Sequence, residues 1–220
     1  MVDQSITDNT EIELQRTIGD IVAENVTEDD YMRVYAESFH EWIRGDVIKM
    51  PPVTLIHDNL TDYLRDLFKA YFALKPLGKV IGAPFVMRIS KPKSRREPDL
   101  QVILNTNLGT LKATYMDGAA DICIEVASRA TAAMDYGEKF TEYEKGGVGE
   151  YWIIDPIRKE CRFYRLNDKQ LYQSHHIDDE GYYKTPQLPQ FKLHVPTLWD
   201  DELPNILQVV EAVKAMVSDV

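Results

Sequence analysis

Two carboxylates in strand-like segments are the residues of this sequence best suited to chemistry. Asp99 stands at the start of the apolar stretch EPDLQVIL (97–104), and Glu125 lies within ADICIEVAS (120–128). Because an unpaired buried charge is strongly unfavourable, each carboxylate needs a partner. Two carboxylates from neighbouring strands can share one magnesium ion, whose other positions are filled by water and phosphate oxygens. The sequence therefore predicts a metal site suited to hydrolysing a phosphate ester.

The strand around Glu125 is expected to have two unlike faces. Side chains alternate across a strand, so residues 122, 124 and 126 would form a core face, and residues 121, 123, 125 and 127 the opposite one. Cys123 and Ala127 are small and would leave room beside Glu125 for a metal ion and a substrate. An edge strand with its acidic face in water would explain the same pattern.

A helix expected at 133–146 offers a cation. Asp135, Lys139 and Tyr143 are four residues apart, so they lie on a common face of that helix. If the helix packs beside the strand at 120–128, Lys139 could reach a metal-bound water. An ordinary ion pair between Asp135 and Lys139 on the surface is the explanation that the spacing alone favours.

The segment RISKPKSRR (88–96) carries five basic residues and no acid, next to Asp99. It could draw phosphate towards the site through Arg88 and Arg96, or it could be a solvated loop. Glu97, which precedes a proline, is expected to point to solvent. The net charge of −11 argues against a protein that coats nucleic acid, since that binding requires phosphate neutralisation by Lys and Arg.

Length and composition favour a single α/β domain in a cytoplasmic protein. The chain has 220 residues, of which 44% are hydrophobic, enough to bury a core. We expect an acidic N-terminal arm at 1–26, mobile or helical, and one domain at 27–220. No stretch resembles a membrane span or a signal peptide. Cys123 and Cys161 are expected to be small core residues.

Hydrophobic periodicity and turn residues predict the remaining elements. Helices are expected at 28–40, 58–74, 133–146 and 202–217. Strands are expected within 41–48 as a pair joined by a tight turn, at 78–82 with a hairpin partner at 84–90, and at 99–105, 120–128, 151–155, 161–166 and 170–176.

Several ordered motifs together resemble those of a known family. They are TEDDY at 27–31, EWIRGDVI at 41–48, a proline five residues before His57, EPD at 97–99, DICIEVAS at 121–128, DYGEKF at 135–140, GVGEYWIIDP at 147–156 and LPQFKL at 188–193. Over residues 27 to about 200 the chain resembles the Uma-type family of restriction endonucleases, within the PD-(D/E)XK nuclease superfamily. The resemblance implies a restriction-endonuclease-like α+β fold, a mixed β-sheet core flanked by helices.

The resemblance also assigns roles to individual residues. Asp99 and Glu125 would bind magnesium, or manganese in its place, with the Val126 carbonyl as a further ligand and Glu41 completing or supporting the shell. The superfamily's lysine belongs two residues after the glutamate, where this chain has Ala127, so its role would pass to Lys139. Asp135 and Tyr143 would orient that lysine, and His57 could touch substrate.

Three functional interpretations follow. The first is a magnesium-dependent endonuclease acting on DNA, most simply as a two-fold dimer if it cuts both strands. The second is a binding or regulatory module that kept the nuclease fold without efficient turnover, as Ala127 would allow. The third is an enzyme acting on another phosphate ester, because no DNA-reading motif is recognisable.

Overall fold

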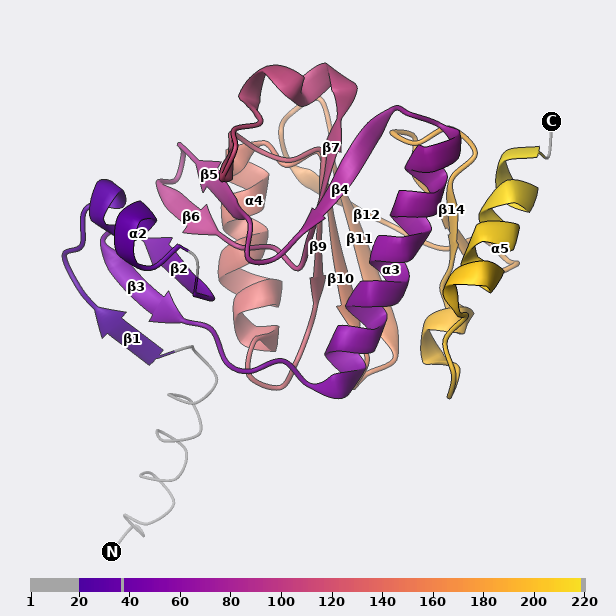
Figure 1. Ribbon diagram of the computed structural model, residues 1–220, viewed down its shortest axis with the longest axis horizontal. Helices are drawn as coiled ribbons and strands as arrows, with labels where there is room; N and C mark the ends of the chain where they lie inside the picture. Colours follow the sequence, from indigo (N-terminus) through magenta and orange to yellow (C-terminus); the bar gives the residue numbers. More distant parts are fainter. Residues whose placement is uncertain (1–19, 37, 219–220) are drawn as a thin grey trace, which may run out of the picture.

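A computed structural model describes residues 20–36 and 38–218 of the chain (Figure 1). Residues 1–19, which make up most of the predicted N-terminal arm, lie outside the described residues. Residues 20–23, also assigned to that arm, form β1 (Asp20–Ala23), which pairs with β3 (Asp46–Lys49). Residues 20–23 of the predicted arm therefore belong to a sheet.

The centre of the molecule is a six-stranded mixed sheet in the order β12-β11-β10-β9-β7-β4. β9 and β10 are parallel, and the other neighbours are antiparallel. This arrangement confirms the predicted mixed sheet, and it makes β9 an interior strand, not the edge strand that remained possible. The strands are β4 (Gly78–Gly82), β7 (Leu100–Leu104), β9 (Ile122–Val126), β10 (Glu150–Asp155), β11 (Glu160–Leu166) and β12 (Tyr172–His175).

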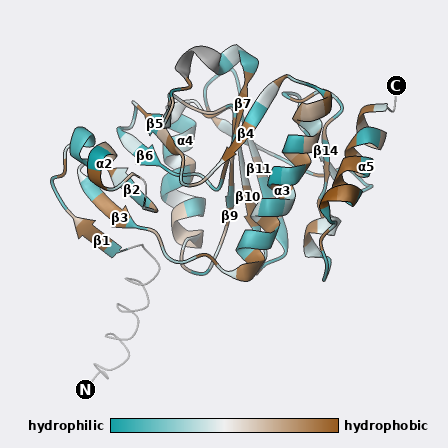
Figure 2. Cartoon of the chain, viewed as in Figure 1, coloured by the Kyte–Doolittle hydropathy of each residue, from teal (hydrophilic) through white to brown (hydrophobic). Residues whose placement is uncertain are grey.

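Helix α3 (Leu55–Leu74) covers one face of this sheet (Figure 1). Thr54 caps its N-terminus by accepting a hydrogen bond from the His57 amide. The buried stripe of α3 packs on the apolar side chains of β9. Helix α5 (Ile206–Ser218) packs against α3 and joins the same core. Figure 2 shows the alternation of apolar and polar segments along α3 that this one-sided burial requires. The prediction that residues 122, 124 and 126 face the core is thus confirmed.

The opposite sheet face is covered by a continuous helical run that changes type. Residues Met134–Lys139 form a π-helical segment, η2, which continues as the α-helix α4 (Phe140–Gly146). Tyr143 of α4 belongs to the same buried cluster as Cys123 of β9, Ala127 just after it, and Ile89. The face of β9 that carries Glu125 is therefore filled with protein, and water does not cover it as on an edge strand.

A second six-stranded sheet lies beyond α4, in the order β1-β3-β2-β6-β5-β8 (Figure 1). Its further strands are β2 (His40–Ile43), β5 (Val86–Ile89), β6 (Ser94–Arg96) and β8 (Tyr115–Asp117). The predicted hairpin of 78–82 with 84–90 is wrong, because β4 and β5 belong to different sheets. Pro84 stands between them and has no N–H to continue a ladder. The basic stretch 88–96 forms a hairpin of β5 and β6, and not a solvated loop.

The remaining elements are short and differ in part from the predictions. The helix expected at 28–40 ends early, as α2 (Glu28–Val34), and the helix expected from 202 begins at Ile206, after Pro204. Two 3-10 segments, η1 (Asn105–Thr110) and η3 (Pro196–Trp199), and a small sheet of β13 (Tyr182–Lys184) with β14 (Lys192–His194) complete the fold. Among the described residues no helix has the length and apolarity to span a membrane.

Candidate active site

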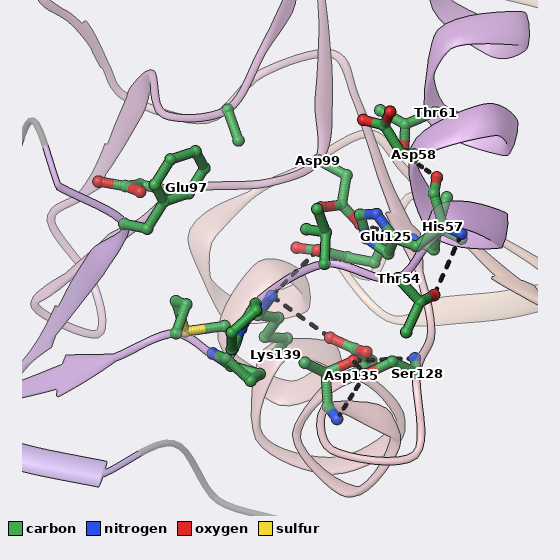
Figure 3. Close-up of a pocket in the computed structure, with 18 of the residues that line it drawn as sticks. Thr54, His57, Asp58, Thr61, Glu97, Asp99, Glu125, Ser128, Asp135 and Lys139 are labelled. Atoms are coloured by element: carbon green, nitrogen blue, oxygen red, sulfur yellow. Dashed lines mark hydrogen bonds and ion pairs between the residues drawn. The ribbon is translucent and has the colours of Figure 1, made fainter.

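Asp99 and Glu125 meet at one pocket of about 290 Å³ (Figure 3). Leu100 of β7 pairs with Ile124 of β9 in antiparallel register, so the residues on either side of this pair are also neighbours across the two strands. The start of α3 contributes His57, and η2 contributes Asp135 and Lys139. The prediction that Asp99 and Glu125 lie on neighbouring strands is confirmed.

Asp99 is held through one of its two carboxylate oxygens. Its Oδ2 accepts a hydrogen bond from the Val126 amide at 2.7 Å and lies 3.0 Å from His57 Nε2. Both contacts use Oδ2, and the side chain is 17% exposed towards the pocket. Burial lowers the pKa of His57, but the bond to Asp99 outweighs it and leaves that pKa raised. His57 therefore opens α3 and also orients Asp99.

Glu125 is almost completely buried at the end of β9, with a partner for each oxygen. Its Oε1 accepts a hydrogen bond from the Tyr143 hydroxyl at 2.7 Å, and its Oε2 lies 3.0 Å from Lys139 Nζ. Burial raises the pKa of Glu125 well above its usual range; Lys139 opposes this effect, and the carboxylates of Asp99 and Asp135 add to it. The site therefore holds more carboxylates than one ammonium group can neutralise.

Lys139 lies at the centre of the carboxylates and not on the surface. Its side chain is 2% exposed, and its Nζ lies 3.3 Å from Asp135 Oδ1 and 3.6 Å from Glu41 Oε1. Burial lowers the pKa of Lys139, but the carboxylates of Glu125, Glu41 and Asp135 together raise it well above the usual value. The explanation by a surface ion pair is wrong, because the helix face that carries these residues packs against the sheet.

Asp135 shares the burial of Lys139, one helical turn earlier. It is 1% exposed, and burial raises the pKa of its carboxyl against the pull of Lys139. Tyr151 of β10 donates a hydrogen bond to the backbone carbonyl of Asp135 and so fixes η2 to the sheet. A π-helical turn widens the helix locally and is frequent at functional sites.

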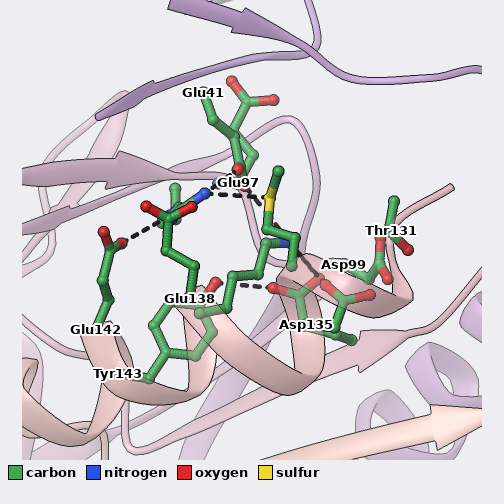
Figure 4. Close-up of polar contacts among 12 residues, drawn as sticks. Glu41, Glu97, Asp99, Thr131, Asp135, Glu138, Glu142 and Tyr143 are labelled. Atoms are coloured by element: carbon green, nitrogen blue, oxygen red, sulfur yellow. Dashed lines mark hydrogen bonds and ion pairs between the residues drawn. The ribbon is translucent and has the colours of Figure 1, made fainter. Parts of the chain in front are cut away.

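Arg96 forms a second buried charge cluster, which shares Glu41 with Lys139. Figure 4 labels two carboxylates of this cluster, Glu41 and Glu142. The Arg96 guanidinium lies 2.7 Å from Glu41 Oε2 and 2.8 Å from Glu142 Oε2, and the side chain is fully buried. The prediction that Arg96 draws phosphate towards the site is wrong, because its side chain is fully buried and bound to carboxylates. Arg88 is bound to Glu28 at 2.7 Å and to Asp117 at 3.2 Å, and it does not line the pocket.

Glu41 is fully buried behind Lys139 and also does not line the pocket. Arg96 binds one of its oxygens, and the Glu97 amide donates to the other at 3.2 Å. Burial raises the pKa of Glu41, but Lys139 and Arg96 outweigh it and leave that pKa lowered. The geometry thus makes Glu41 a partner of the two cations, not a group facing the pocket.

The prediction that Glu97 points to solvent is wrong. Its side chain is 6% exposed and lies 3.4 Å from the Tyr31 hydroxyl of α2. Burial, followed by the nearby charge of Glu41, raises the pKa of Glu97 to about 8. The preceding β6 places Glu97 inside the molecule, which the local sequence did not indicate. Glu142 was also missed, because its partner Arg96 is 46 residues away in the chain.

One wall of the pocket next to the carboxylates is apolar. It is formed by the segment between β3 and α3 and by the residue before β2: Phe39, Met50, Pro51, Pro52 and Val53. Sequence reasoning did not single out this wall, because it becomes contiguous with Asp99 only through the arrangement of the two sheets. The pocket thus combines an acidic floor with an apolar side.

The donor set of the floor suits a divalent cation. Carboxylate oxygens are the ligands of magnesium and calcium, and magnesium is commonly held by one or two carboxylates, with water in its remaining positions. The described residues contain no group of three or more His, Cys, Asp or Glu side chains gathered to hold a metal. A site built on Asp99 and Glu125 needs only two, and the excess negative charge around Lys139 favours a further cation.

Comparisons with known proteins identify the family and agree with the fold. The family model Uma2, described as "Putative restriction endonuclease", matches residues 28–196. The chain is also similar to a solved structure from Anabaena variabilis, described as a "putative nuclease belonging to DUF820", with a TM-score of 0.67. The two sequences are 16% identical over 79% of this chain and 97% of that chain, a level that shows a shared fold. None of the curated proteins compared with the chain matches it.

Proposed function

The chain belongs to the Uma2 family of restriction-endonuclease-like proteins, and from this premise we propose that it is a metal-dependent endonuclease that hydrolyses phosphodiester bonds in DNA. The observation that carries the proposal is the meeting of Asp99 and Glu125, from adjacent strands, in one pocket with the buried amine of Lys139. Magnesium is the metal best matched to these oxygen ligands, and manganese can replace it.

Asp99 and Glu125 would hold the cation, with the Val126 carbonyl as a possible further ligand. The bound cation would polarise the phosphoryl group and make hydroxide available at neutral pH. His57 and the Val126 amide fix Asp99 through Oδ2, which leaves Oδ1 to face the pocket. Tyr143 and Lys139 fix Glu125 through Oε1 and Oε2 respectively, so both carboxylates are oriented before a ligand arrives.

Lys139 would stabilise the negative charge that develops on the phosphate and orient the attacking water. Ala127, at the superfamily's usual lysine position, has no charged group, and it is 1% exposed and packs in the core. Lys139 reaches Glu125 from the neighbouring helix and supplies the ammonium group from there. Asp135 and Glu41 hold that ammonium group in place.

The proposal is tested by cleavage of two closed circles, supercoiled plasmid and circular single-stranded DNA, with Mg²⁺ or Mn²⁺. Only an endonuclease opens a circle. We expect Asp99→Asn and Glu125→Gln to reduce cleavage to the level seen with a chelator. Glu211→Gln serves as the matched control, because Glu211 is an exposed carboxylate of α5 that pairs with Lys214, and neither residue lines the pocket.

Cleavage that is equal in the wild type and all three variants would show that the assigned carboxylates are not the site. DNA binding without cleavage under any metal would instead favour the rival function, a binding module on the nuclease fold.

A further inference from the structure

The apolar wall next to the carboxylates has no role in metal binding or in orienting Lys139. Phe39 is its only aromatic member among the described lining residues, and its side chain is 51% exposed. A large apolar side chain left half in water beside a polar floor is suited to contact a ligand. The remainder of the wall, from Met50 to Val53, includes two prolines and is conformationally restricted.

The backbone of Phe39 is itself unusual. Its φ is +53°, in the left-handed region that bulky residues rarely adopt. Its carbonyl accepts a hydrogen bond from the Met50 amide at 2.9 Å, which joins the two halves of the apolar wall. Strained residues persist where the surrounding structure fixes them, and they are frequent at sites that clamp ligands.

The depth of the floor restricts what can enter. Asp99 is 17% exposed and Glu125 is 3% exposed at the side chain, so a scissile phosphate must enter the pocket to reach them. At about 290 Å³ the pocket is at the small end of ligand sites and fits a single nucleotide better than a segment of duplex. Enzymes that act in such recesses take single strands or extrude one nucleotide from the stack.

The charge of the pocket also favours an unpaired strand over a duplex. Its acidic lining residues are Asp58, Glu97, Asp99, Glu125 and Asp135, and its basic ones are His57, Arg65 and Lys139. Lys139 is neutralised within the site, and Arg65 is paired with Asp62. Binding through many phosphate contacts, as duplex DNA requires, is therefore poorly supported here, whereas base stacking on an aromatic side chain does not depend on excess positive charge.

We infer that the wall formed by Phe39, Met50, Pro51, Pro52 and Val53 binds an unpaired nucleobase next to the cleaved phosphate, with Phe39 as the stacking platform. The substrate class is therefore single-stranded or locally unpaired nucleic acid. This inference rests on the proposed nuclease function for its substrate, but it concerns a different side of the pocket and different residues.

The test measures binding of the whole protein to a labelled single-stranded oligonucleotide and to its perfect duplex, with Ca²⁺ in place of Mg²⁺. We expect tighter binding to the single strand. Phe39→Leu keeps the apolar character but removes the ring, and it should weaken that binding about tenfold, the effect of losing one base–aromatic stack. Phe39→Trp should bind as the wild type does. Leu207→Ala, which truncates an exposed side chain of α5, should have no effect.

Strands with one abasic nucleotide, moved position by position, supply the second readout. One position should weaken wild-type binding about as much as Phe39→Leu does, and the two changes together should cost no more than either alone. Independent losses, or no loss with Phe39→Leu, would overturn the inference. The inference would also be overturned if the protein were a dimer that Phe39→Leu dissociates without changing oligonucleotide binding. The wall would then be an interface between two copies.

Cleavage of circular DNA by the wild type, measured in parallel, separates the two proposals. If cleavage depends on Asp99 but the binding losses from Phe39→Leu and from the abasic position are independent, the nuclease proposal stands and the base site is rejected. Coupling without cleavage retains the base site and rejects the nuclease.

Discussion

Replacing Lys139 tests whether its ammonium group compensates the buried carboxylates. Lys139→Met keeps an unbranched chain of similar length but leaves Glu125, Asp135 and Glu41 without the amine that lies 3.0, 3.3 and 3.6 Å from them. Removing one partner of a buried ion pair costs about 3–5 kcal/mol of unfolding free energy. For a chain of this size, that corresponds to a fall in Tm of about 6–20 °C.

The loss of stability should depend on pH in a defined direction. Glu125 and Asp135 have raised pKa values in the folded protein, and removal of Lys139 raises them further. A carboxyl group whose pKa is higher in the folded than in the unfolded protein stabilises the folded state at low pH. For Glu125 this contribution is lost as the pH rises above 4.5, the ordinary pKa of a glutamate. The difference between variant and wild type should therefore be small near pH 5 and largest near pH 8, measured by urea unfolding.

Manganese should restore part of the stability that Lys139→Met loses. Without the ammonium group, the carboxylates of the pocket floor should bind a cation more strongly. A cation present at 100 times its dissociation constant adds about 2.7 kcal/mol to the folded state. Lys145→Met is the matched control, since Lys145 is an exposed lysine of α4, and its stability should stay within about 0.5 kcal/mol of the wild type. Equal stability of Lys139→Met and wild type at pH 8 would refute the reasoning.

Two further predictions concern the neighbouring ion pairs. Arg96→Met should lower the unfolding free energy by about 3–5 kcal/mol in urea titrations, because it leaves the buried Glu142 without its cation and Glu41 with Lys139 alone. Replacement of the exposed Arg44 by Met should change it by less than about 1 kcal/mol, and similar losses in both variants would contradict the burial of Arg96. Burial raises the pKa of Glu28, but Arg95 and Arg88 outweigh it and leave that pKa lowered, so Glu28→Gln should cost roughly 1 kcal/mol at pH 7. That difference should disappear as the pH falls below 4.5 and the wild-type carboxylate takes up a proton; a constant difference down to pH 3 would argue against this ion pairing.

The sequence predicted the central sheet and its carboxylates because those signals are local. Alternating and continuous apolar runs identified β7, β9 and β10, and the Asp135–Lys139–Tyr143 spacing identified one helix face. What that face meets could not be deduced from spacing, since the same pattern describes a surface ion pair.

The second sheet was predicted only in part, because the expected strand pair within 41–48 is confirmed as β2 and β3, but the pairing of β6 with β2 and β5 was missed. The basic stretch at 88–96 looked like a solvated loop, but pairing of β6 with β2 and β5 turns Arg95 and Arg96 inward. Burial of an arginine is stable only with carboxylates such as Glu41 and Glu142, which come from distant segments. No periodicity in the sequence relates such residues, so the role of Arg96 depended on tertiary structure.

The two buried cations each contact three carboxylates, and their position relative to the pocket distinguishes their roles. Arg96 is bound by the buried Glu41 and Glu142 and by the partly exposed Glu138, and it does not line the pocket that holds Asp99, so its ion pairs can be structural. Lys139 faces Glu125 and Asp135 where the pocket opens, with Asp99 adding further negative charge. Structural networks also shift pKa values, but they have no need of uncompensated charge at an opening to solvent. Folding tolerates that excess only if protons or a cation neutralise it, and the divalent cation proposed at Asp99 and Glu125 would do so at neutral pH.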